Sequence, residues 1–222
     1  MLALVLLSAS WIWGKVLPAM SQPQWGSPQA SSLPGNIGAY MTGGAIVGFI
    51  LAMVTIFKKQ WSGVTAPLYA LCQGLFLGGI SAVFEAQYPG IVMQAVALTF
   101  GTAFCMFLVY KSGLVKVNQK FIMGIAAATG AIFLVYMVSF IVSFFGRGLP
   151  FIQSAGPIGI GFSLLVCGIA ALNLILDFWV IEQGARQGAP KYMEWYGAFA
   201  LMVTLIWLYL EILRLLSKMN RR

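Results

Sequence analysis

Seven long apolar stretches dominate this chain and constrain its fold more than any other feature. A run of about 18 or more apolar residues is long enough to cross a bilayer as a helix. These runs take up most of the 222 residues, so no soluble core of useful size is left over. We therefore predict one all-α, polytopic membrane domain over residues 1–222. The predicted spans are roughly 1–20, 38–57, 65–85, 89–110, 121–145, 156–180 and 193–216.

The first run has a second interpretation, because a short apolar stretch near an amino terminus is also typical of a signal peptide. This run lacks the basic region that precedes the apolar part of a signal peptide, and it stays apolar through Trp11, Ile12 and Trp13. Lys15 interrupts it near the far end, where a long side chain can reach the interface. We therefore predict a retained span.

Most of the basic residues lie in the loops between the predicted spans or in the carboxyl-terminal tail. The chain has 13 Lys and Arg against five Asp and Glu, a formal net charge of +8. The internal loops on one side hold seven basic residues, whereas those on the other side hold only Arg147. The positive-inside rule then places the amino terminus and the loops Lys58–Lys59, Lys111–Lys120 and Arg186–Lys191 in the cytoplasm. Such short loops do not provide the folded basic surface that nucleic-acid binding requires.

The carboxyl-terminal tail conflicts with this topology. Seven spans place the tail outside, yet it carries four basic residues, namely Arg214, Lys218, Arg221 and Arg222. Either the last helix overrides the rule or one segment does not fully cross the membrane. The sequence leaves both alternatives open.

Several classes of enzyme are excluded by missing residues. The chain has no histidine, which rules out Ser-His-Asp and Cys-His nucleophile systems. Its three cysteines lie within spans and show no zinc-site spacing, so they are typical of small packing residues. No nucleophile elbow, zinc motif or Walker loop is present. We expect no enzymatic activity and no resident cofactor.

Asp177 is the strongest candidate for a site inside the membrane. A carboxylate in hydrocarbon costs several kcal/mol unless it is paired, solvated or protonated. Asn173 lies four residues earlier on the same helix face, so the two residues form a polar patch. The alternative is an interfacial anchor, although Asp is short and reaches the interface less well than Lys or Arg. Gln73 and Thr204 are further polar residues inside other predicted spans.

Glu211 lies late in the last predicted span, and Arg214 follows it by three residues on the same face. This spacing predicts an intrahelical ion pair near the far interface. Asp177 lies about 7 Å below the membrane boundary, whereas Thr204 and Glu211 lie about 18 Å and about 28 Å into the last helix. Helix tilt can close the gap between Asp177 and Thr204, but not the gap of about 20 Å between Asp177 and Glu211. We therefore predict that Asp177 does not contact Glu211. It is expected to face the last helix between Phe199 and Thr204, with Thr204, Asn173, water or a neighbouring helix as hydrogen-bond partner.

Four segments together resemble the Bax inhibitor-1/YccA-like family of membrane proteins, also called the transmembrane Bax inhibitor motif family. They are residues 67–81 (PLYALCQGLFLGGIS), 91–102 (IVMQAVALTFGT), 176–178 (LDF) and 192–216 (YMEWYGAFALMVTLIWLYLEILRLL). The likeness extends over about residues 38–218, and the last segment looks like a bacterial branch of the family. It implies a seven-helix fold in which six helices surround the last one.

The resemblance also implies a pH-sensitive calcium leak, in which an Asp on the sixth helix pairs with an Asp on the seventh near the cytoplasmic side. Asp177 matches the first Asp. Thr204 occupies the second position when the helix ends are aligned, whereas a gapped alignment puts Glu211 there. The frequent Glu-Gly pair of the family is Gln73-Gly74 in this chain. Both departures weaken a direct transfer of the calcium-leak activity.

Two functions follow as hypotheses. The first is a pH-sensitive cation (calcium) leak in the bacterial inner membrane, with Asp177 as proton sensor and Asn173 and Thr204 along the ion pathway. Gln73 and Glu211 are additional polar candidates, and calcium would bind only transiently. The second is a non-conducting regulatory protein that binds a membrane protease or other membrane quality-control machinery. Both hypotheses place the chain in a lipid bilayer.

Overall fold

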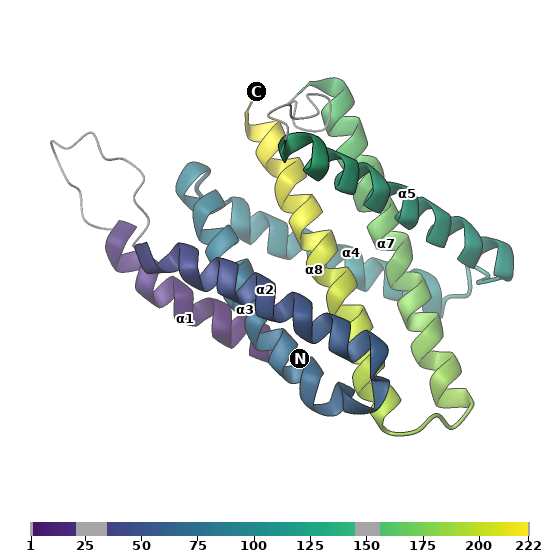
Figure 1. The fold of residues 1–222 in the computed structure, drawn as a ribbon. Helices are drawn as coiled ribbons and strands as arrows, with labels where there is room; N and C mark the ends of the chain where they lie inside the picture. Colours follow the sequence, from purple (N-terminus) through teal and green to yellow (C-terminus); the bar gives the residue numbers. More distant parts are fainter. Residues whose placement is uncertain (1, 21–34, 145–155, 222) are drawn as a thin grey trace, which may run out of the picture. The chain divides into compact units, whose positions relative to one another are not determined.

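The structure is a computed structural model that describes residues 2–20, 35–144 and 156–221. Over these ranges the fold is all-α, as predicted, with no strand (Figure 1). The loop that contains Arg147 lies outside the described residues. The helices are α1 (Leu2–Met20), α2 (Gly35–Phe57), the short 3-10 helix η1 (Lys59–Trp61), α3 (Ser62–Gln87), α4 (Ile91–Lys111), α5 (Gln119–Phe144), α7 (Pro157–Arg186) and α8 (Tyr192–Asn220).

Five of these helices are long and apolar enough to cross a membrane: α3 together with η1, α4, α5, α7 and α8. Two further apolar helical segments, Leu2–Gly14 and Met41–Phe57, are shorter than this among the residues whose side chains the structure describes. Many large apolar side chains face outward, including Phe49, Phe104 and Phe133, each 62% exposed. Large apolar patches of this kind mark surfaces that contact lipid or protein. The chain is thus a multi-pass membrane protein.

Each of the seven described α-helices corresponds to one predicted span, and the largest differences lie at two carboxyl ends. Helix α7 continues past residue 180 to Arg186 and α8 continues past 216 to Asn220, whereas α2 and α3 each begin three residues before the predicted 38 and 65. Hydrophobicity marks the part of a helix that suits hydrocarbon, whereas the backbone hydrogen-bond ladder continues into the interface. The turn before α8 is therefore shorter than the predicted 182–191. Gly188, with φ at +64°, follows the end of α7 in the left-handed conformation that ends many helices.

The described chain divides into two compact units. The first comprises Met1–Pro89 and Gly188–Met202, and the second comprises Gly90–Gln187 and Val203–Arg222. In the first unit α3 packs against both α1 and α2, and in the second α4 and α5 each pack against α7 (Figure 1). The predicted single domain, with six helices around the last, stays a prediction.

Glycines allow the close packing of the first unit. A Cβ added at Gly74 would lie 1.7 Å from Ser8 Oγ, and one added at Gly44 would lie 2.8 Å from the carbonyl oxygen of Cys72. Between α2 and α3, Thr55 Oγ1 donates a hydrogen bond to Thr65 Oγ1 at 2.7 Å. Small residues at helix contacts of this kind let two backbones approach closely in a membrane, where lipid provides no hydrophobic drive between helices.

Candidate functional site

Asp177 lies on α7 with its side chain mostly inside the second unit. Helix α7 begins after Gly156 with Pro157 in its first turn, where proline's missing N–H costs no hydrogen bond. The Thr204 hydroxyl of α8 hydrogen-bonds the Asp177 carboxyl group, so the predicted partner is confirmed. The second oxygen, Oδ2, is buried and has no hydrogen-bond partner among the described residues. The site thus holds one carboxyl oxygen that the described residues leave unsatisfied.

Asn173 shares the α7 face of Asp177, but its amide group is used elsewhere. Its Nδ2 donates to Thr129 Oγ1 of α5 at 2.8 Å and to the carbonyl oxygen of Ile169 at 2.9 Å. The amide therefore joins α7 to α5 and does not donate to the Asp177 carboxyl group. Of the two named side-chain partners proposed for Asp177, the structure supports Thr204.

Glu211 forms the predicted ion pair with Arg214, and a tyrosine of α5 joins the pair. Arg214 Nη1 lies 2.9 Å from Glu211 Oε1 and 3.1 Å from Oε2. The Tyr136 hydroxyl of α5 donates to Glu211 Oε1 at 2.9 Å and accepts from Arg214 Nη1 at 2.7 Å. Glu211 is only 2% exposed whereas Arg214 is 41% exposed, so the carboxylate is buried while the guanidinium group reaches the protein surface. Within the described second unit, Asp177 and Glu211 have separate partners.

Lys218, counted above with the basic carboxyl-terminal tail, is part of the packed end of the last helix. It belongs to α8 and is only 4% exposed. Its Nζ donates to the carbonyl oxygen of Gly159 at 3.0 Å and to Ser163 Oγ at 2.8 Å, both on α7. The spacing in the sequence indicates that Lys218 shares a helix face with two other charged residues. It follows Arg214 by four residues and Glu211 by seven. Thr129 and Tyr136, also seven residues apart, mark the corresponding face of α5.

Gln73 belongs to the first unit and contacts its own helix. Its Nε2 donates to the Tyr69 hydroxyl at 3.1 Å, one turn earlier on α3. Its Oε1 is buried and lacks a hydrogen-bond partner among the residues that the structure describes. The Tyr69 ring in turn packs edge-on against Phe199, with ring centroids 5.0 Å apart. These contacts give Gln73 a packing role, and its place in an ion pathway stays a prediction.

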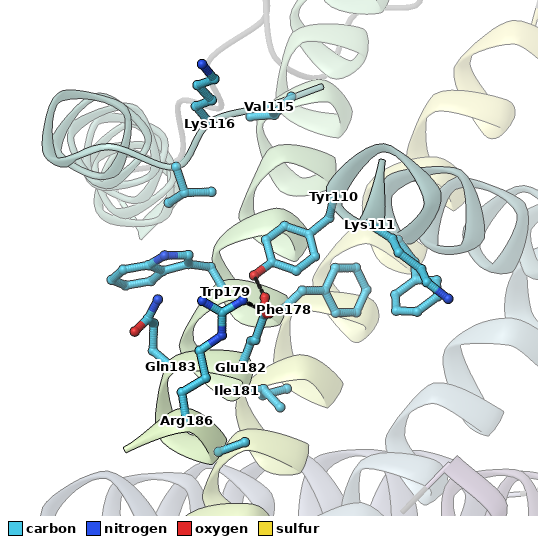
Figure 2. Close-up of a pocket in the computed structure, with 13 residues that line it drawn as sticks. Tyr110, Lys111, Val115, Lys116, Phe178, Trp179, Ile181, Glu182, Gln183 and Arg186 are labelled. Atoms are coloured by element: carbon cyan, nitrogen blue, oxygen red, sulfur yellow. Dashed lines mark hydrogen bonds and ion pairs between the residues drawn. The ribbon is translucent and has the colours of Figure 1, made fainter. Parts of the chain in front are cut away.

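The ends of α4 and α7 enclose a pocket of about 830 Å³, most of whose lining residues are labelled in Figure 2. On one wall, Glu182 accepts hydrogen bonds from the Tyr110 hydroxyl and from Arg186 Nη2, the latter at 2.5 Å. The Glu182–Arg186 pair is largely exposed, with side chains 40% and 67% exposed. Neither Asp177 nor Thr204 lines this pocket.

A resident metal site has little support in the described residues. Across residues 2–20, 35–144 and 156–221, no three His, Cys, Asp or Glu side chains gather closely enough to hold a metal ion. A cation beside Asp177 would therefore meet one carboxyl group together with neutral oxygens. Calcium prefers six to eight oxygen ligands, so this arrangement would bind it weakly.

A comparison with known protein families shows which family this chain belongs to. The family model described as Bax inhibitor 1 like matches residues 1–221. The chain belongs to the Bax inhibitor 1 like family. The match confirms the resemblance and extends it beyond the predicted 38–218 to almost every residue. Neither the search of curated proteins nor that of solved structures found a match.

Proposed function

We propose that this Bax inhibitor 1 like protein is a pH-sensitive cation leak, with calcium as the permeating ion and Asp177 as proton sensor. The unsatisfied Oδ2 atom of Asp177 carries the proposal. A buried carboxyl oxygen without a partner is costly, so a proton, a water molecule or a cation stabilises it. A site that exchanges a proton for a cation would couple ion passage to pH.

The neighbouring side chains support passage rather than storage of the ion. Thr204 contributes a hydroxyl next to the carboxyl group. Glu211, the other buried carboxylate of the second unit, is neutralised by Arg214 and adds no free ligand. One carboxylate with neutral oxygens suits a weak, transient site, which an ion can leave as easily as it enters. Asn173 would support this site indirectly, by holding α7 against α5.

The proposal includes a setting in the membrane. We place the protein in a bacterial inner membrane as a seven-span protein, with α8 surrounded by the other helices and the basic loops in the cytoplasm. The positive-inside bias supports this orientation. The lipid bilayer is the main partner, and we propose neither an enzymatic activity nor a resident cofactor.

Calcium flux in liposomes tests the function. The purified full chain would be reconstituted around a trapped fluorescent calcium indicator and measured from about pH 6 to about pH 8, a range in which perturbed carboxyl groups of functional sites titrate. We expect flux above that of protein-free liposomes, with a dependence on pH. Asp177→Asn should remove most of this dependence, because the amide cannot gain or lose a proton. Glu194→Gln, at an exposed position, is the matched control and should retain the wild-type profile.

The outcomes separate the two hypotheses. An unchanged pH profile in Asp177→Asn would reject Asp177 as the sensor while leaving the leak in place. Wild-type protein that gives no flux above empty liposomes would reject the leak. The non-conducting regulatory role, with a membrane protease or other membrane protein as partner, would then be the better hypothesis.

A further inference from the structure

Beyond cation flux, we propose that the pocket at the ends of α4 and α7 binds the phosphate headgroup of an anionic membrane lipid. The pocket has a volume of about 830 Å³ and is lined by the last residues of α4, the loop after it and the last three turns of α7. This volume lies within the range of about 300 to 1,000 Å³ that is typical of small-molecule sites. It is large enough for a glycerophosphate group.

The charges that line the pocket favour an anion. Lys111, Lys116 and Arg186 contribute three positive charges, and Glu182 contributes one negative charge. Arg186 already pairs with Glu182. Among the described residues, neither Lys111 nor Lys116 forms a salt bridge with an acidic residue. Both lysines are exposed. The pocket therefore keeps an excess of two positive charges, and basic pockets at the ends of spanning helices are suited to lipid headgroups.

The position of the pocket points to a lipid rather than to a soluble phosphate. Helices α4 and α7 are both long and apolar enough to span a membrane, and the pocket lies where they end. This is the level of the headgroups whichever side of the membrane it faces. The pocket also contains Trp179 and Tyr110, and such aromatic residues are enriched at membrane interfaces. Phe107, which lines the pocket, is 42% exposed, and Phe104, about one turn earlier on α4, is 62% exposed; together they offer an apolar surface for the acyl chains.

Contacts among the lining residues hold one wall of the pocket in place. The Tyr110 hydroxyl donates to Glu182, and the Phe178 ring packs edge-on against Phe107 with centroids 5.4 Å apart. Figure 2 shows Tyr110, Glu182 and Arg186 grouped together, with Lys111 and Lys116 extending from two other edges. Lysine side chains are long and flexible, so their ammonium groups can turn toward a phosphate that enters between them. The ordered wall would lower the entropy lost on binding.

Lipid binding to the full-length protein tests this proposal. Phosphatidylglycerol would be titrated into the purified protein in neutral detergent, and the bound lipid counted by native mass spectrometry, with phosphatidylcholine as the uncharged comparison. We expect preferential binding of phosphatidylglycerol. The double variant Lys111→Gln/Lys116→Gln should weaken it roughly 25-fold, or about fivefold for each cation removed near a membrane surface. The single variant Lys116→Gln, in the exposed loop, provides a second measurement if the double variant does not fold.

The matched control removes the same charge elsewhere. Lys58→Gln/Lys59→Gln lies in another basic loop and should change phosphatidylglycerol binding less than about threefold, because neither lysine lines the pocket. Equal losses in the two double variants would overturn the proposal in favour of diffuse attraction. Binding of soluble glycerol 3-phosphate as tight as that of the lipid would also overturn it, because the occupant would then be a free phosphate.

Discussion

The ammonium group of Lys218 lies 2.8 Å from the hydroxyl oxygen of Ser163 and joins the last turns of α8 to the first two turns of α7. A second hydrogen bond, to the carbonyl oxygen of Gly159, lies at 3.0 Å. Both acceptors are neutral, although the lysine is only 4% exposed. A buried ammonium group is tolerated only where its N–H donors find partners. These contacts therefore stabilise the end of α8 that the sequence presents as a charged tail.

Removing the Ser163 hydroxyl should matter only while Lys218 is present. Ser163→Ala takes one of two acceptors from a buried cation and should lower the free energy of unfolding by about 1.5 to 3 kcal/mol, the usual range for a hydrogen bond to a charged group. In a Lys218→Met background the same change should cost less than about 0.5 kcal/mol, a typical value where no buried partner is lost. Denaturant unfolding in detergent micelles measures both values. Equal costs in the two backgrounds would show that the contact contributes nothing.

The ion pairs on α8 and α7 should differ in energy because their burial differs. Arg214→Ala leaves the carboxylate of Glu211, 2% exposed, without its cation and should cost about 3 kcal/mol or more. Arg186→Ala breaks the exposed pair with Glu182 and should cost less than about 1 kcal/mol. Thermal unfolding in micelles compares the two variants. The double variant Glu211→Gln/Arg214→Gln should recover part of the loss, and no recovery would argue against an unpaired charge as the cause.

Two adjacent glycines of α2 provide a matched test of the helix contact in the first unit. A Cβ at Gly44 would lie 2.8 Å from the backbone carbonyl oxygen of Cys72, so Gly44→Ala must push α2 away from α3. We expect a loss of at least about 1 kcal/mol, the lower range for overpacking. A Cβ at Gly43 meets nothing within 4 Å, and Gly43→Ala should be neutral or stabilise the helix by up to about 1 kcal/mol. Similar melting temperatures for the two variants would contradict the contact.

Thiol labelling tests the proposed orientation of the basic loops. Single cysteines at Gln60, Ser112 and Gln187 should resist an impermeant reagent added outside intact cells, because these loops are predicted to be cytoplasmic. Gln60 is a better position than nearby Ser62, which is buried and donates a hydrogen bond to the carbonyl oxygen of Tyr192 at 2.6 Å. The background must lack the three native cysteines, which are Cys72, Cys105 and Cys167.

The short loop between α3 and α4 provides the control for this labelling. A cysteine at the exposed residue Gln87 should react from outside, since one span separates it from Gln60. Labelling of the three basic-loop positions, with protection at Gln87, would invert the topology. Labelling at only one of the three would instead indicate that a segment does not cross the membrane.

Much of the Asp177 environment could be predicted from helix geometry. The rise per residue, together with helix tilt, left Thr204 within reach of Asp177 and excluded Glu211, and the structure pairs Asp177 with Thr204. The spacing of three residues also predicted the Glu211–Arg214 pair. These contacts depend on positions along helices and on one short turn. The amide contact of Asn173 was missed, because Thr129 lies on a helix whose rotation about its own axis the sequence did not reveal.

The sequence by itself determined that the chain is helical and belongs to a membrane, because long apolar runs leave the backbone only its own helix for hydrogen bonds. It also determined which residues share a helix face, since the period of 3.6 residues is a property of the backbone. Only the tertiary structure decided which polar side chains are buried. Lys218 is buried because α7 presents the Ser163 hydroxyl and the carbonyl oxygen of Gly159 beside it, whereas the basic residues Lys111 and Lys116 remain exposed. Hydropathy assigns these lysines the same value, and the difference between them arises from neighbours that lie far away in the sequence.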